Sequence, residues 1–383
     1  MEHIYITALH MLHGGVEKVI ASLANAFTRR GYQVTILCSY RLGDPVYRLD
    51  EGVEVVYLTD RHPNREEFHK ALSSKNPTAI LREAAYAVST LAAKKKTMIQ
   101  AIQRISSGII ISTRNEHSVL LSKYGSSGII KIAQLHHDHM FNRKLIRDFR
   151  FHYSNIDRFV LLAPRLCREA EEFMAPYNHH TQCVTIENFF DPDTAGTGER
   201  TRQVVSVGRL HQEKGFDRLL EIWAKAQRSG WTLKIIGGGS EMDRLKEQAA
   251  RLGISDSVIF TGMLPYRNVL DEMHRSQIYA MTSHTECFPL VLLEAMVNGL
   301  PVAAFDVRVG PEAIICDGKD GFLVSDNDLD EFAQKLSLLM ADDGLCRKMG
   351  EDAAADVQRF SRDRIIGKWE EVFTSCREGL QMR

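Results

Sequence analysis

The sequence predicts an α/β protein with two doubly wound parallel sheets, and two observations carry this prediction. Short β-branched runs alternate with amphipathic stretches along the chain, which is typical of parallel α/β architecture. The alternation is interrupted by the Pro-, Gly- and Thr-containing segment 188–202 and then restarts. At 383 residues, the chain is long enough for two domains. We therefore expect a first domain over 1–190, a linker over 191–202 and a second domain over 203–359.

The first half contains seven strand candidates with helical stretches between them. One of these helices, Val16–Arg30, has apolar residues at a 3.6-residue period and is followed by Gly31, which is suited to end a helix. The strand candidates are His3–Leu9, Tyr32–Cys38, Val53–Leu58, Gly108–Ser112, Ile129–His136, Arg158–Ala163 and Cys183–Ile186.

The second half repeats this alternation, and no short repeat or low-complexity tract interrupts it. Helices are expected over about 216–228, 241–252 and 290–298. The strand candidates are Val204–Val207, Leu233–Ile236, Val258–Phe260, Ile278–Thr282 and Val302–Phe305.

The composition excludes several classes of protein. Apolar residues make up 44% and charged residues 25% of the chain, which is an ordinary globular balance. No apolar run approaches the roughly 18 residues that cross a bilayer, and the N-terminus lacks the pattern of a signal peptide. Seven cysteines without a CxxC pair argue against a disulfide framework and a structural zinc site. We expect a cytoplasmic protein.

The formal net charge is −1, but the two halves differ in sign. Residues 1–190 hold 24 Lys and Arg against 18 Asp and Glu, whereas the remainder holds 24 against 31. A basic first half suits an anionic substrate or an anionic membrane surface. Chance scatter of charge between domains explains the difference equally well.

Ligands of doubly wound folds bind where strand C-termini meet helix N-termini, so the segments after the strands are the candidate sites. After the first strand, Gly14 and Gly15 permit close approach to the backbone, and the helix N-terminus that follows favours an anion. The GxGxxG spacing of nicotinamide-binding proteins is absent. A plain strand-to-helix turn explains the glycine pair as well.

After the strand that ends at Val207, Gly208 opens a loop that contains Arg209 and Lys214. Two cations between a strand end and a helix start suit a diphosphate, to which each charge-assisted contact contributes about 1.5–3 kcal/mol. Two solvated surface charges are the alternative. In the loop after the next strand, Gly238 and its glycine neighbours permit close approach of a nucleotide base or ribose.

The most specific pattern is a pair of glutamates, Glu286 and Glu294, separated by seven residues. Glu286 precedes a predicted helix and Glu294 lies about one turn into it, so both carboxylates can accept hydrogen bonds from one ligand. The amides of Leu290 and Val291 at the helix start are available to a phosphate. An amphipathic helix with two surface acids is the alternative, but this helix is apolar all round, which predicts burial and a partner for Glu294.

Three histidines and one aspartate follow one another at residues 136–139, at the end of a strand candidate. Residues adjacent in the chain seldom ligate one tetrahedral ion, so a metal site is disfavoured. We predict a single functional histidine, either His136, because it completes the strand, or His137.

These motifs, in this order, resemble those of the retaining glycosyltransferases of family 4, including bacterial enzymes of surface polysaccharide and lipopolysaccharide synthesis. That family has the GT-B fold, in which two Rossmann-like domains face each other across a cleft. The resemblance spans nearly the whole chain, and it departs from the family at Cys287, where glycine is usual. The matching segments are GGVE (14–17), Asn188, GRLHQEKGFDRLLEIW (208–223), LKIIGGGSEMDRLKEQAARLGI (233–254), HTECFPLVLLEAMVNGLPV (284–302) and GPEAIICDGKDGFLV (310–324).

The resemblance implies a role for each candidate residue. Arg209 and Lys214 would hold the donor diphosphate, Glu294 the ribose and Glu286 the transferred sugar. His136 would contact the sugar near the reacting carbon, and it joins Glu286, Arg209 and Lys214 as the implied catalytic set. The C-terminal helix over 360–383 would pack back on the first domain. The implied donor-binding residues are Gly14, Gly15, Gly208, Arg209, Lys214, Gly238, Phe288, Pro289, Leu290, Val291 and Glu294.

The implied reaction moves a hexose or N-acetylhexosamine, with retention, from a nucleotide diphosphate sugar to a saccharide or lipid-linked saccharide acceptor. A UDP-sugar is the expected donor. Two alternatives remain, which are another enzyme of the same fold, such as an epimerase, and a scaffold that binds a nucleotide sugar without turnover. No nucleic acid partner is expected.

No metal or other cofactor is expected. The Asp-x-Asp pairs at 191/193, 326/328 and 328/330 lie in the predicted linker or at a predicted helix start, where Asp is a normal cap. Basic clusters at Lys94–Lys96 and Arg143–Arg150 would dock the protein peripherally on the inner face of an anionic membrane, or they are ordinary solvated helix faces.

Overall fold

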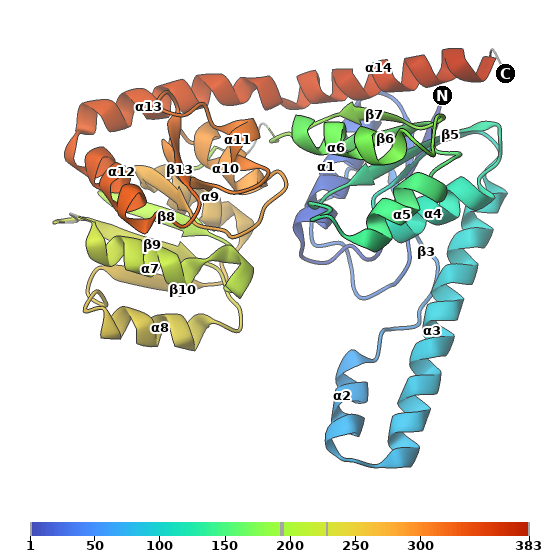
Figure 1. The fold of residues 1–383 in the computed structure, drawn as a ribbon, viewed down its shortest axis with the longest axis horizontal. Helices are drawn as coiled ribbons and strands as arrows, with labels where there is room; N and C mark the ends of the chain where they lie inside the picture. Colours follow the sequence, from blue (N-terminus) through green and yellow to red (C-terminus); the bar gives the residue numbers. More distant parts are fainter. Residues whose placement is uncertain (1, 192–194, 227–228, 382–383) are drawn as a thin grey trace. The chain divides into compact units, whose positions relative to one another are not determined.

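The computed structural model describes residues 2–191, 195–226 and 229–381. These residues form two compact units. Unit 1 comprises residues 2–161, 167–186 and 366–381, and unit 2 comprises residues 162–166, 187–191, 195–226 and 229–365. Each unit contains one parallel sheet with flanking helices (Figure 1), so the predicted fold class is confirmed.

Unit 1 is built on a seven-stranded parallel sheet in the order β3-β2-β1-β4-β5-β6-β7. The chain moves outward in one direction from β1 and then returns to add β4 on the other side of β1, where Ile4 pairs with Ile109. This reversal between β1 and β4 is the switch point at which doubly wound folds bind ligands. The strands are β1 His3–Ala8, β2 Gln33–Cys38, β3 Val53–Tyr57, β4 Gly108–Ser112, β5 Ile129–Leu135, β6 Arg158–Leu161 and β7 Gln182–Thr185.

The helices of this half are α1 Gly15–Arg29, α2 Arg65–Ser73, α3 Pro77–Arg104, α4 Asn115–Tyr124, α5 Arg143–Phe151 and α6 Pro164–Met174. Gly31 follows α1 with φ 89°, a conformation that glycine adopts without strain, as its place after the helix predicted.

Unit 2 repeats the architecture with six parallel strands in the order β10-β9-β8-β11-β12-β13. Its switch point lies between β8 and β11, where Val204 pairs with Ile278. The strands are β8 Gln203–Val207, β9 Thr232–Ile236, β10 Val258–Gly262, β11 Ile278–Met281, β12 Val302–Asp306 and β13 Gly321–Ser325. The helices are η2 Gln212–Lys214, α7 Phe216–Lys225, α8 Met242–Arg251, α9 Tyr266–Arg275, α10 Leu290–Val297, α11 Pro311–Ile314, α12 Leu329–Ala341, α13 Asp343–Asp356 and η3 Val357–Phe360.

The predicted strands are all present, with ends that shift by one or two residues. β5 ends at Leu135, so His136 follows the strand instead of completing it. The sequence analysis missed β13 because its five residues lie directly after a turn rich in Gly and Asp, with no alternating pattern of their own.

The predicted linker 191–202 is part of unit 2 where the structure describes it. The amide of Gly196 donates to Asn298 Oδ1 at 2.7 Å, and the Arg200 guanidinium donates to the Ser276 carbonyl oxygen at 3.1 Å. Residues 192–194, which include Asp193 of one Asp-x-Asp pair, lie outside the described residues.

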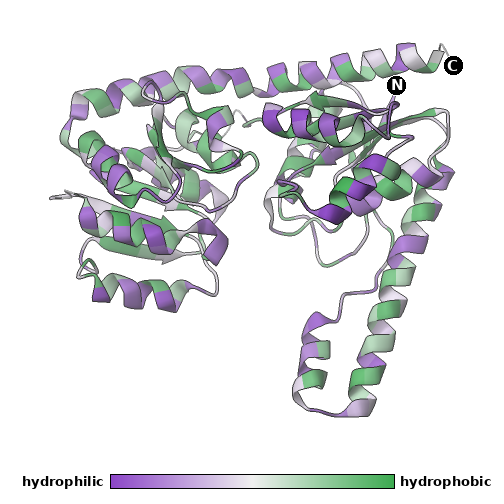
Figure 2. Cartoon of the chain, in the orientation of Figure 1, coloured by the Kyte–Doolittle hydropathy of each residue, from purple (hydrophilic) through white to green (hydrophobic). Residues whose placement is uncertain are grey.

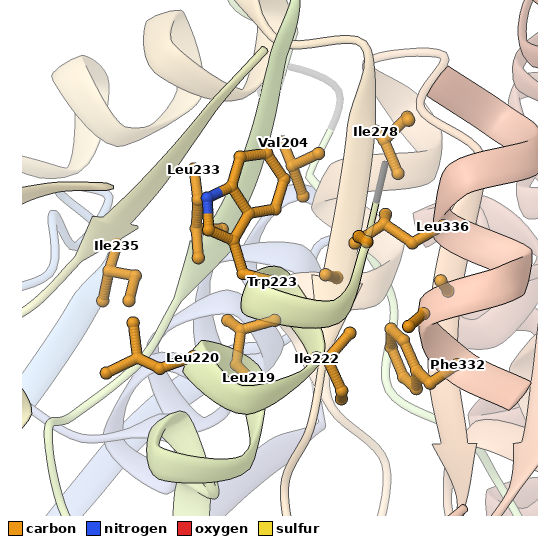
Figure 3. Close-up of a cluster of buried hydrophobic side chains, with 14 of the residues drawn as sticks. Val204, Leu219, Leu220, Ile222, Trp223, Leu233, Ile235, Ile278, Phe332 and Leu336 are labelled. Atoms are coloured by element: carbon orange, nitrogen blue, oxygen red, sulfur yellow. The ribbon is translucent and has the colours of Figure 1, made fainter. Parts of the chain in front are cut away.

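The core of unit 2 is a continuous layer of apolar side chains between the sheet and its helices. Figure 3 shows Trp223 of α7 packed toward residues of β8 and β9, with Phe332 and Leu336 of α12 nearby. Trp223 is fully buried, and its indole N–H donates to Ser257 Oγ at 3.1 Å. Burial of such a side chain stabilises the fold by about 2–3 kcal/mol.

The C-terminal helix α14 spans Arg362–Gln381, and its residues from 366 onward belong to unit 1. Trp369 and Phe373 are buried against Phe27 of α1, with ring centroids 6.0 and 5.5 Å away. Arg377 pairs with Glu2 next to β1. The chain end thus closes the core of the unit in which the chain begins.

Helices α2 and α3 form a hairpin that extends away from the rest of unit 1 (Figure 1). We call residues 61–104 the helical arm. Asn76 caps α3 by accepting from the amides of Thr78 and Ala79. Apolar residues are interspersed with polar ones along the arm (Figure 2), and Leu81, Val88 and Leu91 are 58–73% exposed. No helix within the described residues is both long and apolar enough to cross a membrane.

Candidate functional site

The candidate donor-site residues of unit 2 converge on its switch point. The Gly208–Lys214 segment follows β8, and the Glu286 segment follows β11, its neighbour in the sheet. Because parallel strands end at the same edge, these two loops meet although about 70 residues separate them. The sequence predicted the loops individually, and the sheet order brings them together.

Lys214 and Glu286 form the central contact of this edge. Lys214 Nζ donates to Glu286 Oε1 at 2.6 Å, and the two side chains are 24% and 11% exposed. An ion pair this sheltered keeps both charges oriented for a ligand and is stronger than a surface pair. The arrangement fits a charged ligand that contacts both groups.

Arg209, the second predicted cation, stands apart from this pair. Its side chain is 76% exposed and donates to Oε1 of Glu213, four residues further along the chain, at 2.8 Å. A surface pair of this kind contributes well under 1 kcal/mol. The guanidinium is therefore held loosely and can turn toward a ligand at little cost.

Glu294 is buried in α10, as the apolar character of that helix predicted. Its expected partner is Tyr266, at the start of α9, whose hydroxyl donates to Glu294 Oε1 at 3.1 Å. The sequence analysis missed Tyr266, because nothing in the local pattern links it to a glutamate 28 residues away. Glu286 and Glu294 thus have different partners.

The N-terminus of α10 completes the edge. Pro289 is the residue before the helix, and Leu290 and Val291 occupy its first turn, where helix amides have no acceptor within the helix. Phe288 is buried and packs edge-on against Phe360 at 5.2 Å, and its carbonyl oxygen accepts from Asn188 Nδ2 at 3.4 Å. These contacts of Phe288 therefore hold the segment before α10 in place.

The glycines in the loops after β8 and β9 differ in how closely the backbone of the other loop approaches them. A Cβ on Gly237 would overlap the Gly208 carbonyl oxygen, and one on Gly239 would overlap that of Leu210. Gly208 and Gly238 are less constrained, because an added Cβ would meet mainly the side chains of Phe216 and Met263. The loops after β8 and β9 thus need Gly237 and Gly239 to pack on each other, whether or not a nucleotide approaches.

Arg218 of α7 supports the same edge and was not predicted. It is 5% exposed, donates to the carbonyl oxygens of Thr282 and Ser283, and pairs with Asp326 at 2.8 Å. It thereby ties the start of the Glu286 loop to α7. In the sequence, Arg218 is one of several charged residues in an amphipathic helix. Nothing in the local pattern indicates that it is buried or that it donates to two carbonyl oxygens.

At the edge of unit 1, Gly14 and Gly15 begin α1. Gly14 is extended, with φ 169°, and an added Cβ would overlap the Glu17 carboxylate, whereas the space around a Cβ on Gly15 is empty to 4 Å. Glu17 is 7% exposed and lies 3.7 Å from His10 Nδ1. The turn therefore leaves room beside Gly15.

His136 lies directly after β5 with its Nε2 atom buried. Within the described residues, this atom has no hydrogen-bond partner. Burial, with His137 and Arg114 nearby, lowers the pKa of His136 to about 3, so the ring is neutral at physiological pH. A neutral, unpaired imidazole at a strand end is suited to hydrogen bonding with a ligand.

The neighbouring histidines have other surroundings. Partial loss of hydration by the ring, with Arg114 nearby, lowers the pKa of His137, although part of this residue remains exposed to solvent. His139 is buried, with Nε2 2.8 Å from Glu169 Oε2. The histidines of the His-His-Asp-His run thus have different surroundings and different partners.

Two groups of acidic side chains resemble sets of metal ligands. Asp328 caps α12 by accepting from the Glu331 amide at 2.9 Å, which agrees with the predicted capping role. Cys316, Asp320 and Asp356 place potential ligand atoms within 4.8 Å of one another, but the Arg359 guanidinium already lies 2.7 Å from Asp356. The Asp356 carboxylate thus already has a cationic partner.

Comparison with known proteins shows similarity to glycosyltransferases in sequence and in fold. Residues 189–356 match the family model of the glycosyl transferases group 1. The amylovoran biosynthesis glycosyltransferase AmsD of Erwinia amylovora is 26% identical over 374 residues, which cover 94% of this chain and 95% of that protein. An exopolysaccharide phosphotransferase of Streptomyces coelicolor is 30% identical over 375 residues, and this chain spans 39% of its length.

The fold has solved counterparts. A crystal structure of S. aureus TarM, a mutant in complex with fondaparinux, α-GlcNAc-glycerol and UDP, superposes with a TM-score of 0.76 at 14% identity, covering 97% of this chain and 100% of that one. The likeness concerns the fold. The chain has the fold of GT-B glycosyltransferases, is similar over most of its length to the amylovoran biosynthesis glycosyltransferase AmsD, and matches the group 1 glycosyl transferase model over residues 189–356 of its second half.

Proposed function

We propose that the chain is a retaining glycosyltransferase that moves a hexose or N-acetylhexosamine from a UDP-sugar to a saccharide or lipid-linked saccharide. The Lys214–Glu286 pair at the switch point of unit 2 carries this proposal. A donor needs a cation for its diphosphate and an acceptor for its sugar hydroxyls, and this pair offers both within one contact. The UDP in the TarM complex supports the choice of nucleotide.

Different residues of unit 2 would contact different parts of the donor. Lys214, assisted by Arg209 and the first amides of α10, would neutralise the diphosphate. The charge on this leaving group grows as the glycosidic bond breaks, so fixed cations stabilise the transition state more than the ground state. Glu294, held by Tyr266 at 3.1 Å, would accept from the ribose hydroxyls. Glu286 would accept from a hydroxyl of the transferred sugar.

No carboxylate is assigned as nucleophile. In the proposed reaction the bond from the anomeric carbon to the phosphate oxygen breaks, and a bond to the acceptor oxygen forms on the same face. The acceptor proton passes to an oxygen of the leaving diphosphate. His136 is neutral because burial lowers its pKa to about 3. It would form a hydrogen bond with a sugar hydroxyl near the reacting carbon and would not act as an acid.

The helical arm of unit 1 supports a membrane-bound acceptor. Residues 61–104 hold nine Lys and Arg against three Asp and Glu, which equals the whole excess of positive charge in residues 1–190. Leu81, Ala85, Val88 and Ala92 are exposed at the i, i+4, i+7 and i+11 positions of α3. Such an apolar stripe on a cationic hairpin suits an anionic bilayer surface, whereas a second copy of the same arm would be repelled.

Donor binding tests the enzymatic part of the proposal. Wild-type protein, Lys214→Ala and Glu294→Ala are titrated with UDP-glucose, UDP-galactose, UDP-N-acetylglucosamine and UDP, and slow donor hydrolysis is followed. One sugar should bind and hydrolyse, and either substitution should lower kcat/KM by about 100-fold, corresponding to about 2.7 kcal/mol. Lys246→Ala, an exposed lysine on α8, is the matched control. Equal binding by all four proteins would place the donor site elsewhere.

Vesicle sedimentation tests the membrane part separately. Wild-type protein should sediment at low salt with vesicles that contain phosphatidylglycerol and should remain in the supernatant with phosphatidylcholine alone. The double change Lys95→Ala/Lys96→Ala should weaken binding about thirtyfold at about 1 kcal/mol per charge. Lys246→Ala/Arg251→Ala removes the same charge from α8 and should have no effect. Identical sedimentation by both double variants would contradict docking through the arm.

A further inference from the structure

The loop between β5 and α5, residues 136–142, holds two consecutive residues in an unusual backbone conformation. Met140 has φ 45° and Phe141 has φ 52°. Residues with a Cβ rarely adopt positive φ, and two bulky ones in succession are rarer still, because Cβ then approaches the carbonyl oxygen. Strain of this kind persists only where the surroundings enforce it, and it concentrates at ligand-binding positions.

The enforcing contacts come from the two residues just before the pair. Asp138 Oδ1 accepts from the Met140 amide at 2.8 Å, and His139 Nδ1 accepts from the Phe141 amide at 3.1 Å. His139 is itself fixed, because its Nε2 lies 2.8 Å from Glu169 Oε2 and its ring stacks edge-on against Phe173 at 5.2 Å. Asn142 then caps α5 through the amides of Lys144 and Leu145. The loop is therefore rigid.

This loop leaves two large apolar side chains partly exposed, and the ring of Phe141 also packs edge-on against His139 and Phe173, with centroids 5.3 and 6.2 Å away. Met140 is 63% and Phe141 is 55% exposed, while Asp138 and His139 beneath them are buried. Burial of Met140 and Phe141 would favour the fold, so their exposure on a strained loop is costly for stability alone. Such exposure is expected where a ligand covers the side chains.

Two polar atoms at the base of the loop indicate the kind of ligand. Gln134 lies near the end of β5, and His136 follows the last residue of this strand. Within the described part of the chain, Gln134 Oε1 and His136 Nε2 are buried and have no hydrogen-bond partner. Buried polar atoms are almost always satisfied, and these two are available to hydroxyl groups.

We infer that Phe141 and Met140 form a platform for the apolar face of the acceptor's pyranose ring, beside the His136 hydrogen-bonding site. A pyranose presents a face of C–H groups and a rim of hydroxyls, which matches exposed apolar side chains next to unsatisfied polar atoms. The alkyl tail of a lipid would match the apolar pair alone. This inference rests on the proposed function, since it names the acceptor contact of that reaction.

Saturation-transfer NMR with octyl β-D-glucopyranoside below its critical micelle concentration, and with methyl α- and β-glycosides of glucose, galactose and N-acetylglucosamine, tests the platform. Wild-type protein should transfer saturation to the ring C–H protons of at least one glycoside. Saturation confined to the octyl protons would overturn the inference in favour of a lipid tail, and no saturation of any ring proton would also overturn it.

Three variants then separate contact from folding. Phe141→Ala should lower ring saturation and weaken glycoside binding about tenfold, and Phe141→Tyr, which keeps the aromatic face, should retain it. Met140→Gly removes the positive-φ strain, so it should leave Tm unchanged or raise it while weakening binding. The control is Phe151→Ala on α5, an aromatic of similar exposure (53%) that should bind as wild type does. Equal weakening by Phe151→Ala, or full binding by Phe141→Ala, would overturn the platform.

Donor hydrolysis measured on the same samples keeps the two proposals distinct. The platform variants should hydrolyse the UDP-sugar at the wild-type rate, because Lys214 and Glu286 lie in unit 2. Loss of glycoside binding with intact hydrolysis supports the platform. Intact hydrolysis with unchanged glycoside binding removes the platform and leaves the transferase proposal standing. Absence of donor binding in the wild type removes the transferase proposal itself.

Discussion

The two units share one topology but equip their sheet edges in opposite ways. At the switch point of unit 2, the candidate site residues are ions held in pairs, and Lys214 Nζ lies 2.6 Å from Glu286 Oε1. In unit 1, the candidate residue His136 is a neutral ring, since burial lowers its pKa to about 3, and burial also lowers the pKa of His117 on α4 to about 4. His117 is held between Thr7 and Ser39 at 3.0 and 3.2 Å.

This difference follows from what each edge is proposed to bind. A nucleotide diphosphate brings at least two negative charges, which paired cations and helix amides can receive. A saccharide brings only hydroxyls, for which a neutral imidazole both donates and accepts. One scaffold thus serves two chemistries because its loops, and not its strands, carry the ligand contacts.

The largest difference that we expect between the two sheet edges is the loss of stability when a glycine is replaced by alanine. Gly237→Ala would place a Cβ on the Gly208 carbonyl oxygen at φ 142°, which only glycine adopts readily, and we expect a loss of about 3 kcal/mol or more. Gly15→Ala meets no atom within 4 Å and should leave the fold stable or improve it by up to about 1 kcal/mol. Chemical denaturation of the two variants measures both values.

The rate of glycosyl transfer separates a ligand-binding role of Gly15 from a role in stability. If the space beside Gly15 serves a ligand, Gly15→Ala should impair glycosyl transfer in a protein that is fully folded. A Gly237→Ala protein with wild-type stability would show that the loops after β8 and β9 can separate without cost, and it would remove the packing explanation of these glycines.

Acid should weaken unit 1 through its buried histidines. The folded pKa of His117 is about 4 and the unfolded value is about 6.5, so between these values only the unfolded chain binds the proton. Stability is therefore complete above pH 6.5 and falls as the pH drops, by about 2 kcal/mol at pH 5 for this residue. Hydrogen exchange at pH 7.5 and pH 5, corrected for intrinsic rates, should show the loss in unit 1.

His117→Gln identifies the source of this acid sensitivity. It removes the titrating group, so the stability of the variant should change less between the two pH values than that of the wild type. His179→Gln, at an exposed position, should leave the sensitivity as it is. A wild-type profile in His117→Gln would assign the effect to other groups.

Arg209 gives the smallest expected effect. Because its side chain is 76% exposed and pairs with Glu213 at the surface, Arg209→Ala should leave stability within about 0.5 kcal/mol. Donor binding should weaken by about tenfold, less than for Lys214→Ala, since the loosely held guanidinium must be ordered on binding. Calorimetric titration with UDP compares the two variants. A larger loss of affinity in Arg209→Ala than in Lys214→Ala would contradict the prediction.

Much of the fold and part of the site were predictable from the sequence. The strand and helix periods, the glycine after α1 and the apolar helix that buries Glu294 are local features, and each was found within one or two residues. The resemblance to known glycosyltransferases assigned roles to residues in these loops. Tyr266 and Arg218 were missed because each acts on a loop far away in sequence.

By itself, the sequence determined which segments form strands and helices, because side-chain alternation and helical periodicity depend on neighbours within a few residues. It also determined the charge of the helical arm. Only the tertiary structure decided that β8 and β11 are adjacent, and so that Lys214 meets Glu286 across 72 residues. It alone decided that Gly237 packs on Gly208 and that Phe141 stands exposed on a strained loop, because such contacts follow from sheet order and loop packing, which no local pattern encodes.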